Sequence, residues 1–226
     1  MSIAVIKGKV SQSGAEDLLT ASVFGPLRYL PYSEYLKPIL KFSRTIGGDH
    51  LKVPDVADIQ NLRFWPTQYR REPDMEFETD TMKIFIEVKF NSGKSGTGKH
   101  DQLANQYEDL SKSTDKEKAV IYLTKHRTIP LADLHASIDS ISDAYPNLKT
   151  TFRKDLFWIS WYQIWQFLQQ KVNEEKNEQY KLIVNDILDV LIKQRLKHFT
   201  GFTALHTTDS LNGIIAKPVF YEHRPR

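Results

Sequence analysis

The sequence predicts an α/β fold, in which helices flank a β-sheet, for a single domain that spans residues 1–226. Apolar segments of strand length, rich in β-branched and aromatic residues, cluster between about residues 60 and 125. Helical apolar stripes lie on both sides of this region. The chain has 226 residues, of which 40% are hydrophobic and 26% charged, so it is long enough to enclose a core. We place the core of the domain at about residues 14–165 and a C-terminal helical extension at about residues 166–226.

The first predicted element is a helix that begins near Ser13 and ends before Pro31. Ser13 and Glu16 have the spacing of a capping box, in which each side chain accepts a backbone N–H of the first turn. An apolar stripe with helical spacing follows, formed by Leu18, Leu19, Val23 and Leu27. Residues 32–58 are predicted to form a short helix and a loop through the sequence GGDH.

Five segments are predicted to form the strands of the sheet. They are LRFWPTQYR (62–70), PDMEFET (73–79), KIFIEVKF (83–90), KAVIYLT (118–124) and DLFWIS (155–160). The second and third segments are expected to form an antiparallel hairpin that turns around residues 79–82.

Three further helices complete the predicted order. The first covers DQLANQYEDLSKS (101–113), and the second carries Trp161, Ile164, Trp165 and Leu168 at core spacing. We interpret the aromatic residues at 157–167 as core rather than as a surface on which bases stack. The long last helix covers residues 177–199. Its apolar face, with Leu182, Ile183, Ile187, Val190 and Leu191, fits either the domain's own core or a dimer interface.

Composition excludes several classes of function. The chain has no cysteine, so it holds no disulfide, zinc-thiolate site or thiol nucleophile. No apolar stretch is long enough to cross a bilayer, and the first residues lack the apolar segment of a signal peptide. We therefore expect a cytoplasmic protein without a membrane partner. The net charge is +3, and the basic residues after residue 190 form either a phosphate-facing surface or a solvated tail.

Two acidic residues are expected to face each other across the predicted hairpin. A turn centred on residues 80 and 81 pairs Glu78 with Lys83, which is a favourable cross-strand contact. The same register places Asp74 opposite Glu87, with their Cβ atoms about 5 Å apart on one face of the sheet.

This pair of carboxylates has a chemical use. Two carboxylates so close repel each other unless a divalent cation lies between them. Lys89 shares the face of Glu87, because side chains alternate along a strand. Its ammonium could orient a water molecule or offset charge on a phosphate oxygen.

Pro73-Asp74, followed after twelve residues by Glu87-Val88-Lys89, resembles the P-D…(D/E)-x-K signature of the PD-(D/E)xK nuclease superfamily. The resemblance extends from the first predicted helix to the fourth strand. It implies a restriction-endonuclease-like fold, with a mixed β-sheet core flanked by helices. It also implies an Mg²⁺-dependent deoxyribonuclease that hydrolyses DNA phosphodiester bonds with an activated water, and in which Mn²⁺ can substitute. Asp74, Glu87 and Lys89 would then be the catalytic residues.

The same resemblance suggests supporting residues. Glu16 on the first helix, with the adjacent Asp17 as the alternative, and the Val88 carbonyl would complete the metal site with the two acidic residues of the hairpin. The role of Glu16 in a capping box competes with this one. In related branches a glutamine and a tyrosine on the helix after the E-x-K strand lie near the site, which points to Gln102, Gln106 and Tyr107. Gln102 and Gln106 are expected to contact DNA.

The loop GKSGTGKH (93–100) nearly has the spacing of a nucleotide-binding P-loop, G-x-x-x-x-G-K-[ST]. However, His100 occupies the position where a hydroxyl should hold Mg²⁺. We interpret this segment as a basic loop in which Lys94, Lys99 and His100 contact the DNA backbone. Residues 125–127, Lys-His-Arg, could extend the same surface after the fourth strand.

A second class of function remains open from the sequence. The same fold could serve as a non-catalytic DNA-binding or subunit-interaction module, with DNA, a second copy or a larger protein complex as partner. Cleavage of DNA would separate the enzyme from this module, and the oligomeric state would separate a dimer from a monomer.

Overall fold

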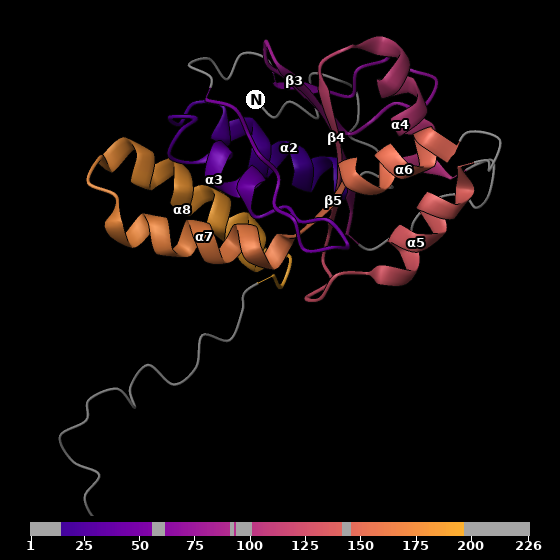
Figure 1. Ribbon diagram of the computed structural model, residues 1–226. Helices are drawn as coiled ribbons and strands as arrows, with labels where there is room; N and C mark the ends of the chain where they lie inside the picture. Colours follow the sequence, from indigo (N-terminus) through magenta and orange to yellow (C-terminus); the bar gives the residue numbers. More distant parts are fainter. Residues whose placement is uncertain (1–14, 56–61, 91–92, 94–100, 142–145, 197–226) are drawn as a thin grey trace, which may run out of the picture.

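The computed structural model describes residues 15–55, 62–90, 93, 101–141 and 146–196 (Figure 1). Within this part of the chain a mixed sheet has the strand order β1-β2-β3-β4-β5. The strands are β1 (Leu62–Phe64), β2 (Met75–Glu78), β3 (Met82–Lys89), β4 (Glu117–Thr124) and β5 (Leu156–Ser160). The first three pair antiparallel, and β3, β4 and β5 pair parallel. The predicted α/β class and the five strands are therefore confirmed.

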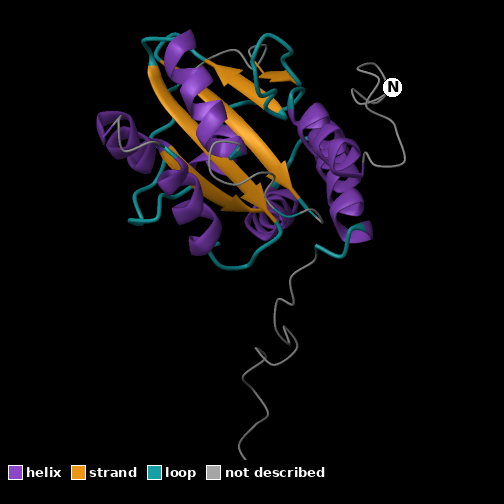
Figure 2. Ribbon diagram, turned by 90° about the vertical axis from the view of Figure 1, so that its right-hand side faces the viewer, coloured by secondary structure: helices purple, strands orange, loops and turns teal. Residues whose placement is uncertain are grey.

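Helices cover both faces of the sheet (Figures 1 and 2). One face carries α2 (Ala15–Leu27), α3 (Leu36–Lys41), α7 (Trp161–Glu174) and α8 (Glu178–Lys193). The other carries α4 (Gln102–Ser113), α5 (Leu131–Ser140) and α6 (Pro146–Asp155). The second set lies in the connections between the parallel strands, which require such crossovers. Within the described residues no helix is long and apolar enough to span a membrane.

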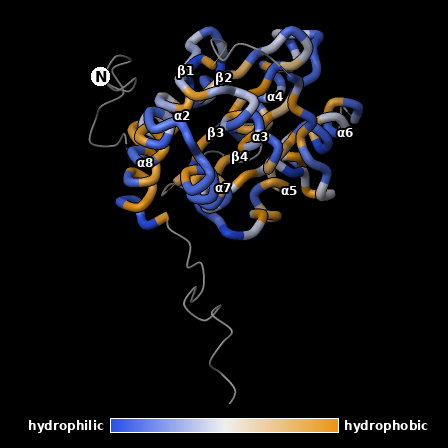
Figure 3. The backbone as a smooth tube through the Cα atoms, turned by 90° about the vertical axis from the view of Figure 1, so that its left-hand side faces the viewer, coloured by the Kyte–Doolittle hydropathy of each residue, from blue (hydrophilic) through white to orange (hydrophobic). Residues whose placement is uncertain are grey.

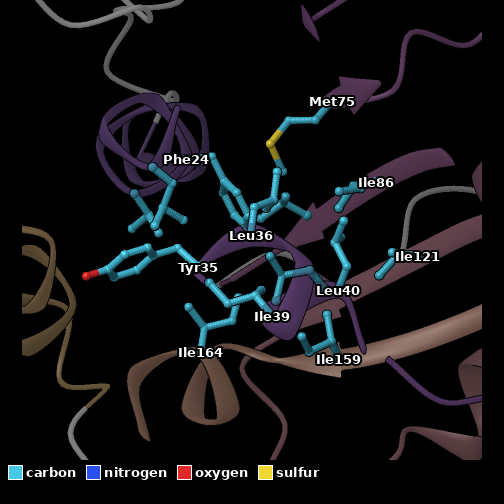
Figure 4. Close-up of a cluster of buried hydrophobic side chains, with 14 of the residues drawn as sticks. Phe24, Tyr35, Leu36, Ile39, Leu40, Met75, Ile86, Ile121, Ile159 and Ile164 are labelled. Atoms are coloured by element: carbon cyan, nitrogen blue, oxygen red, sulfur yellow. The ribbon is translucent and has the colours of Figure 1, made fainter. Parts of the chain in front are cut away.

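The alternation of side chains along each strand divides the core into two clusters. Ile84, Ile86 and Val88 of β3 belong to the cluster under α2, α3, α7 and α8. Figure 4 shows part of this cluster, where α3 packs over the sheet. Phe85 of β3 and Tyr122 of β4 belong to the cluster under α4, α5 and α6. Apolar stretches accordingly gather in the interior around β3 and β4 (Figure 3).

A threonine fixes the turn of the β2–β3 hairpin. The Thr79 hydroxyl accepts the N–H groups of Thr81 at 3.3 Å and Met82 at 2.9 Å, and the Thr79 N–H donates to the Met82 carbonyl at 2.8 Å. The register pairs Glu78 with Lys83, as predicted. Lys116 adds a further restraint, because its ammonium donates to the Glu78 carboxylate and to the Thr79 carbonyl.

Some predicted boundaries need correction. β1 ends at Phe64 rather than near residue 70, because Trp65 has a φ of 46° and Pro66 has no N–H to donate. The first helix ends at Leu27, with Pro26 in its last turn. Ser13 and its capping box lie outside the described residues. The mixed segment 32–58 contains the short helix α3 and a turn in which Gly48 adopts a φ of 93°.

Two helices, α5 and α6, are absent from the sequence-based prediction. α5 buries few residues, among them Leu134 and Ile138, which have an i, i+4 spacing. α6 is largely polar and buries Phe152 against the sheet. Each helix has too narrow an apolar stripe to stand out from the surrounding loop sequence.

The last two helices pack on the domain's own core. Val184, Ile187, Leu188 and Leu191 of α8 are buried, and α8 lies against α2 and α7. The predicted boundary between core and extension, at residues 165 and 166, falls inside α7, whose residues on both sides of it join the same cluster. Residues 197–226 lie outside the described part of the chain.

We predict that Leu191→Ala lowers the free energy of unfolding by about 2–5 kcal/mol, because it opens a cavity in this cluster. Leu182→Ala is the matched control, since Leu182 is 65% exposed and its loss should change stability by less than about 0.5 kcal/mol. Urea denaturation measures both effects. If both variants lowered the free energy of unfolding equally, and the loss depended on protein concentration, α8 would instead lie in an interface between chains.

Candidate functional site

The hairpin brings Asp74 to the end of β3. Met75 pairs with Ile86, and the same register continued by one residue sets Asp74 opposite Glu87. The Asp74 carboxylate oxygen Oδ2 accepts the Val88 N–H at 2.7 Å, and its backbone carbonyl accepts the Trp65 N–H at 3.0 Å. Asp74 is therefore fixed to both neighbouring segments at the place where the ladder of β2 and β3 ends.

Glu87 lies on the face of the sheet that α4 covers, and it is buried with 1% of its surface exposed. Its Oε1 atom lies 2.6 Å from the Lys89 ammonium, and its Oε2 atom accepts from the Gln106 amide at 2.7 Å. Gln106 is itself fully buried and also reaches the Glu72 carbonyl at 3.5 Å. Neighbouring side chains thus hold both oxygens of the Glu87 carboxylate in one orientation.

Glu16 reaches the same end of β3 from the first turn of α2. Its Oε1 atom accepts the N–H of Phe90 at 2.7 Å. Phe90 directly follows Lys89, so this hydrogen bond ties α2 to the strand next to the two acidic residues. We call Glu16, Asp74, Glu87 and Lys89 the carboxylate site. The hydrogen bond between Glu16 and Phe90 favours a role for Glu16 at this site over a role confined to helix capping.

Burial and mutual repulsion act on the acids of the carboxylate site. Burial raises the pKa of Asp74 well above its usual value, and the Glu87 charge raises it further, although the Val88 N–H and Lys89 act against both effects. Burial also raises the pKa of Glu87, and Lys89 and Gln106 only partly offset this effect. The ionised forms of both groups are therefore held at a cost in stability.

Lys89 is the cation of the carboxylate site. Burial alone would lower the pKa of Lys89, but the charges of Glu87, Asp74 and Glu16 overcome this effect and raise it. The ammonium thus stays protonated at neutral pH. It can donate hydrogen bonds and stabilise negative charge, but it cannot accept a proton there.

The carboxylate site has the donor chemistry for a hard divalent cation. Three carboxyl groups lie near one ammonium, and carboxylate oxygens are the ligands that Mg²⁺ prefers. The described residues nevertheless contain no ready group of three or more His, Cys, Asp or Glu side chains arranged to hold a metal ion. The acids instead contact backbone N–H groups, Lys89 and Gln106.

The predicted DNA-contacting residues have different positions. Lys94, Lys99 and His100 lie outside the described residues. Gln102 begins α4 and is half-buried, and its Oε1 atom has no hydrogen-bond partner among the described residues. Gln106 points toward Glu87 rather than toward solvent.

The position of Gln106 could have been read from the sequence. Leu103, Gln106, Tyr107 and Leu110 are spaced as one face of a helix, and all four are buried in α4. A polar residue in the middle of such a stripe must point toward the sheet, where it needs a polar partner. Tyr107, from the same face, donates to Asp155 at 2.6 Å and does not belong to the carboxylate site.

Comparisons with known proteins add little to this site. No family model matches the chain, and no solved structure matches it. The chain is similar to an uncharacterized protein, PM0110, of Pasteurella multocida (strain Pm70), with 26% identity over 174 residues. The match covers 72% of this chain and 63% of that protein, so the chain spans less than two thirds of the relative's length.

We predict that Asp74→Asn raises the melting temperature by a few degrees when it is measured in EDTA. The amide keeps an oxygen for the Val88 N–H and removes the repulsion with Glu87. A gain of ~1 kcal/mol corresponds to about 2–4 °C in a chain of this size. Because the pKa of Asp74 is raised above 3.8, its charge destabilises the fold only above that pH. The gain should therefore be absent below about pH 4 and grow toward neutral pH.

Glu78→Gln is the control with the opposite sign. Burial tends to raise the pKa of Glu78, but Lys116, Lys83 and Arg63 overcome this effect and lower it, so its ionised form stabilises the fold. The control should lower the melting temperature at neutral pH. A similar loss for Asp74→Asn would mean that Asp74 serves the fold rather than a site.

Proposed function

We propose that this protein is a metal-dependent deoxyribonuclease of the PD-(D/E)xK type, with a restriction-endonuclease-like arrangement of its sheet. The observation that carries the proposal is the meeting of Asp74, Glu87 and Lys89 at the end of the β2–β3 hairpin, with Glu16 beside them. The sequence signature is short, but in this chain the register of β2 and β3 places its two acidic residues opposite each other. Buried charges that lower stability are typical of functional sites.

Each residue of the carboxylate site has a separate role in the proposed reaction. Asp74 and Glu87 would hold Mg²⁺, or Mn²⁺ in its place, with support from Glu16 and the Val88 carbonyl. A bound Mg²⁺ supplies a Lewis acid that polarises the scissile phosphate and makes water a stronger nucleophile. Lys89 donates hydrogen bonds that orient the attacking water and stabilise the charge that develops on the phosphate oxygens.

Gln106 acts as a positioning residue in this mechanism. Its amide N–H holds Glu87 Oε2 while Lys89 contacts Oε1, so the carboxylate cannot rotate freely. Fixed ligands reduce the reorganisation that a reaction would otherwise require.

We predict that Lys89→Ala lowers metal-dependent cleavage of DNA by at least about 100-fold, because it removes a donor aimed at developing charge. Folding and most of the DNA affinity should remain. The assay uses linear, circular and single-stranded DNA with Mg²⁺, Mn²⁺ or EDTA.

Lys118→Ala serves as the control for this experiment. Lys118 lies near the opposite end of β4, beside Lys83, and its loss removes the same charge from the sheet. Cleavage should persist in this variant. Cleavage by Lys89→Ala at the wild-type rate would contradict the role assigned to Lys89.

One observation favours the second candidate function, a non-catalytic DNA-binding or subunit-interaction module. In the described residues the acids already have protein partners, and no group of three metal-ligating side chains is ready to bind an ion. In such a module Lys89 and Glu87 would be an internal ion pair. No cleavage by the wild-type protein on any DNA, with either metal, would favour this function over the nuclease.

A further inference from the structure

A cavity of about 500 Å³ lies where the C-terminal ends of β3 and β4 meet the end of α8. Phe90 and Tyr162 contribute aromatic walls, and Lys125, His126, Lys193 and Arg195 contribute basic groups. None of the described residues that line it is acidic. We call this cavity the basic pocket. Its composition is suited to an anion and opposed to a cation.

The β4 side of the basic pocket is rigidly built. The Thr124 hydroxyl oxygen accepts the Trp158 indole N–H at 2.9 Å and the His126 N–H at 3.3 Å. The same hydroxyl lies 3.1 Å from His126 Nδ1, so this contact orients the imidazole ring. Ser160 also donates to the His126 carbonyl at 2.6 Å.

Aromatic rings contact Lys125, which lines the basic pocket, and its neighbour Arg127. The Lys125 ammonium lies 5.5 Å from the centroid of the Phe90 ring, and the Arg127 guanidinium lies 4.6 Å from that of Tyr162. Such contacts orient the long cationic side chains. Lys125, His126 and Arg127 are all exposed.

The α8 side of the basic pocket contains an arginine in an unfavourable conformation. Arg195 has a φ of 59°, in the left-handed region where glycine is preferred after a helix. The Arg195 N–H donates to the Ile192 carbonyl and the Leu196 N–H to the Leu191 carbonyl, which is the hydrogen-bond pattern of a Schellman motif. An arginine here costs about 1–2 kcal/mol relative to glycine. Arg195 is exposed at this position.

We propose that the basic pocket binds a backbone phosphate of a nucleic-acid strand, and that Lys193 and Arg195 at the end of α8 contact it. The identification of the anion as DNA rests on the proposed function. Phe90 lines the basic pocket, follows Lys89 directly and donates its N–H to Glu16. A strand held in the basic pocket thus passes beside the carboxylate site. Exposed cations on two separate elements suit a polyanion better than a single small ion.

The test measures the affinity of the full-length chain for a short fluorescein-labelled single-stranded DNA by anisotropy, in EDTA so that no cleavage occurs. The double variant Lys193→Ala/Arg195→Gly should weaken binding by about tenfold at low salt. The slope of log K against log salt should fall by about 1.4, since each lost phosphate contact removes about 0.7. Inorganic phosphate, used as a competitor at the same ionic strength, should displace little of the DNA, because the protein holds the strand through several backbone phosphates.

The matched control is Lys176→Ala/Lys181→Ala, which removes two charges from the other end of α8 and should leave the affinity and the slope nearly unchanged. An equal loss of affinity in both double variants would mean that only net charge matters, and it would overturn the proposal. Unchanged binding in the Lys193/Arg195 variant would also overturn it. Because binding is measured without a metal, the result stands whether or not the protein cleaves DNA.

Arg195→Gly alone supplies a second measurement. Glycine relieves the left-handed conformation, so the melting temperature should rise while the affinity for DNA falls. A variant that becomes more stable without any loss of affinity would show that the arginine has no role in binding.

Discussion

The antiparallel register of β2 with β3 is the constraint on which the carboxylate site depends. Thr79 closes the turn with its hydroxyl, and Glu78 pairs with Lys83 directly beside it. Because side chains alternate, a slip of one residue would move Glu87 from the face under α4 to the opposite, apolar face. The hydrophobic residues of β3, Ile84 and Ile86, would be displaced at the same time, so the core itself enforces the register.

The two hydrophobic clusters, one on each face of the sheet, differ in whether they accommodate buried polar side chains. Under α2, α3, α7 and α8 the strands contribute apolar residues almost throughout. On the other face α4 contributes Gln106, which gives Glu87 a buried partner. The second oxygen of Glu87 lies 2.6 Å from the Lys89 ammonium in an ion pair. A buried pair of this kind seldom stabilises a fold beyond what apolar residues would achieve, which is consistent with the role proposed for Glu87 and Lys89.

The end of the sheet where β3 and β4 finish combines two opposite electrostatic environments. Glu87 of the carboxylate site lies on the side of α4, whereas the basic pocket lies toward α8 and is lined by cations. Phe90 lines the basic pocket and directly follows Lys89 of the carboxylate site in the sequence. A polyanionic strand attracted by the basic groups would be held close to acids that, without a divalent cation, would repel it. Under the proposed function, the binding of metal and the binding of DNA should therefore support each other.

The sequence predicted the parts of the structure in which local chemistry and global packing agree. The hairpin register followed from one charge pair and the turn position, and the core strands followed from long apolar runs. The short β1 and the helices α5 and α6 were not predictable in the same way, because Trp65 adopts a left-handed conformation and the two helices bury few residues. The contact of Glu16 with Phe90 depends on the packing of α2 against the sheet, which no local pattern encodes.

Isothermal titration calorimetry of Mg²⁺ and Mn²⁺ into the full-length chain tests the central claim most directly. The wild-type protein and Glu78→Gln should bind the cation alike, whereas Asp74→Asn should lose most of the binding. Equal binding by the wild type and Asp74→Asn, or no binding by either, would contradict the assignment of the carboxylate site as a metal centre.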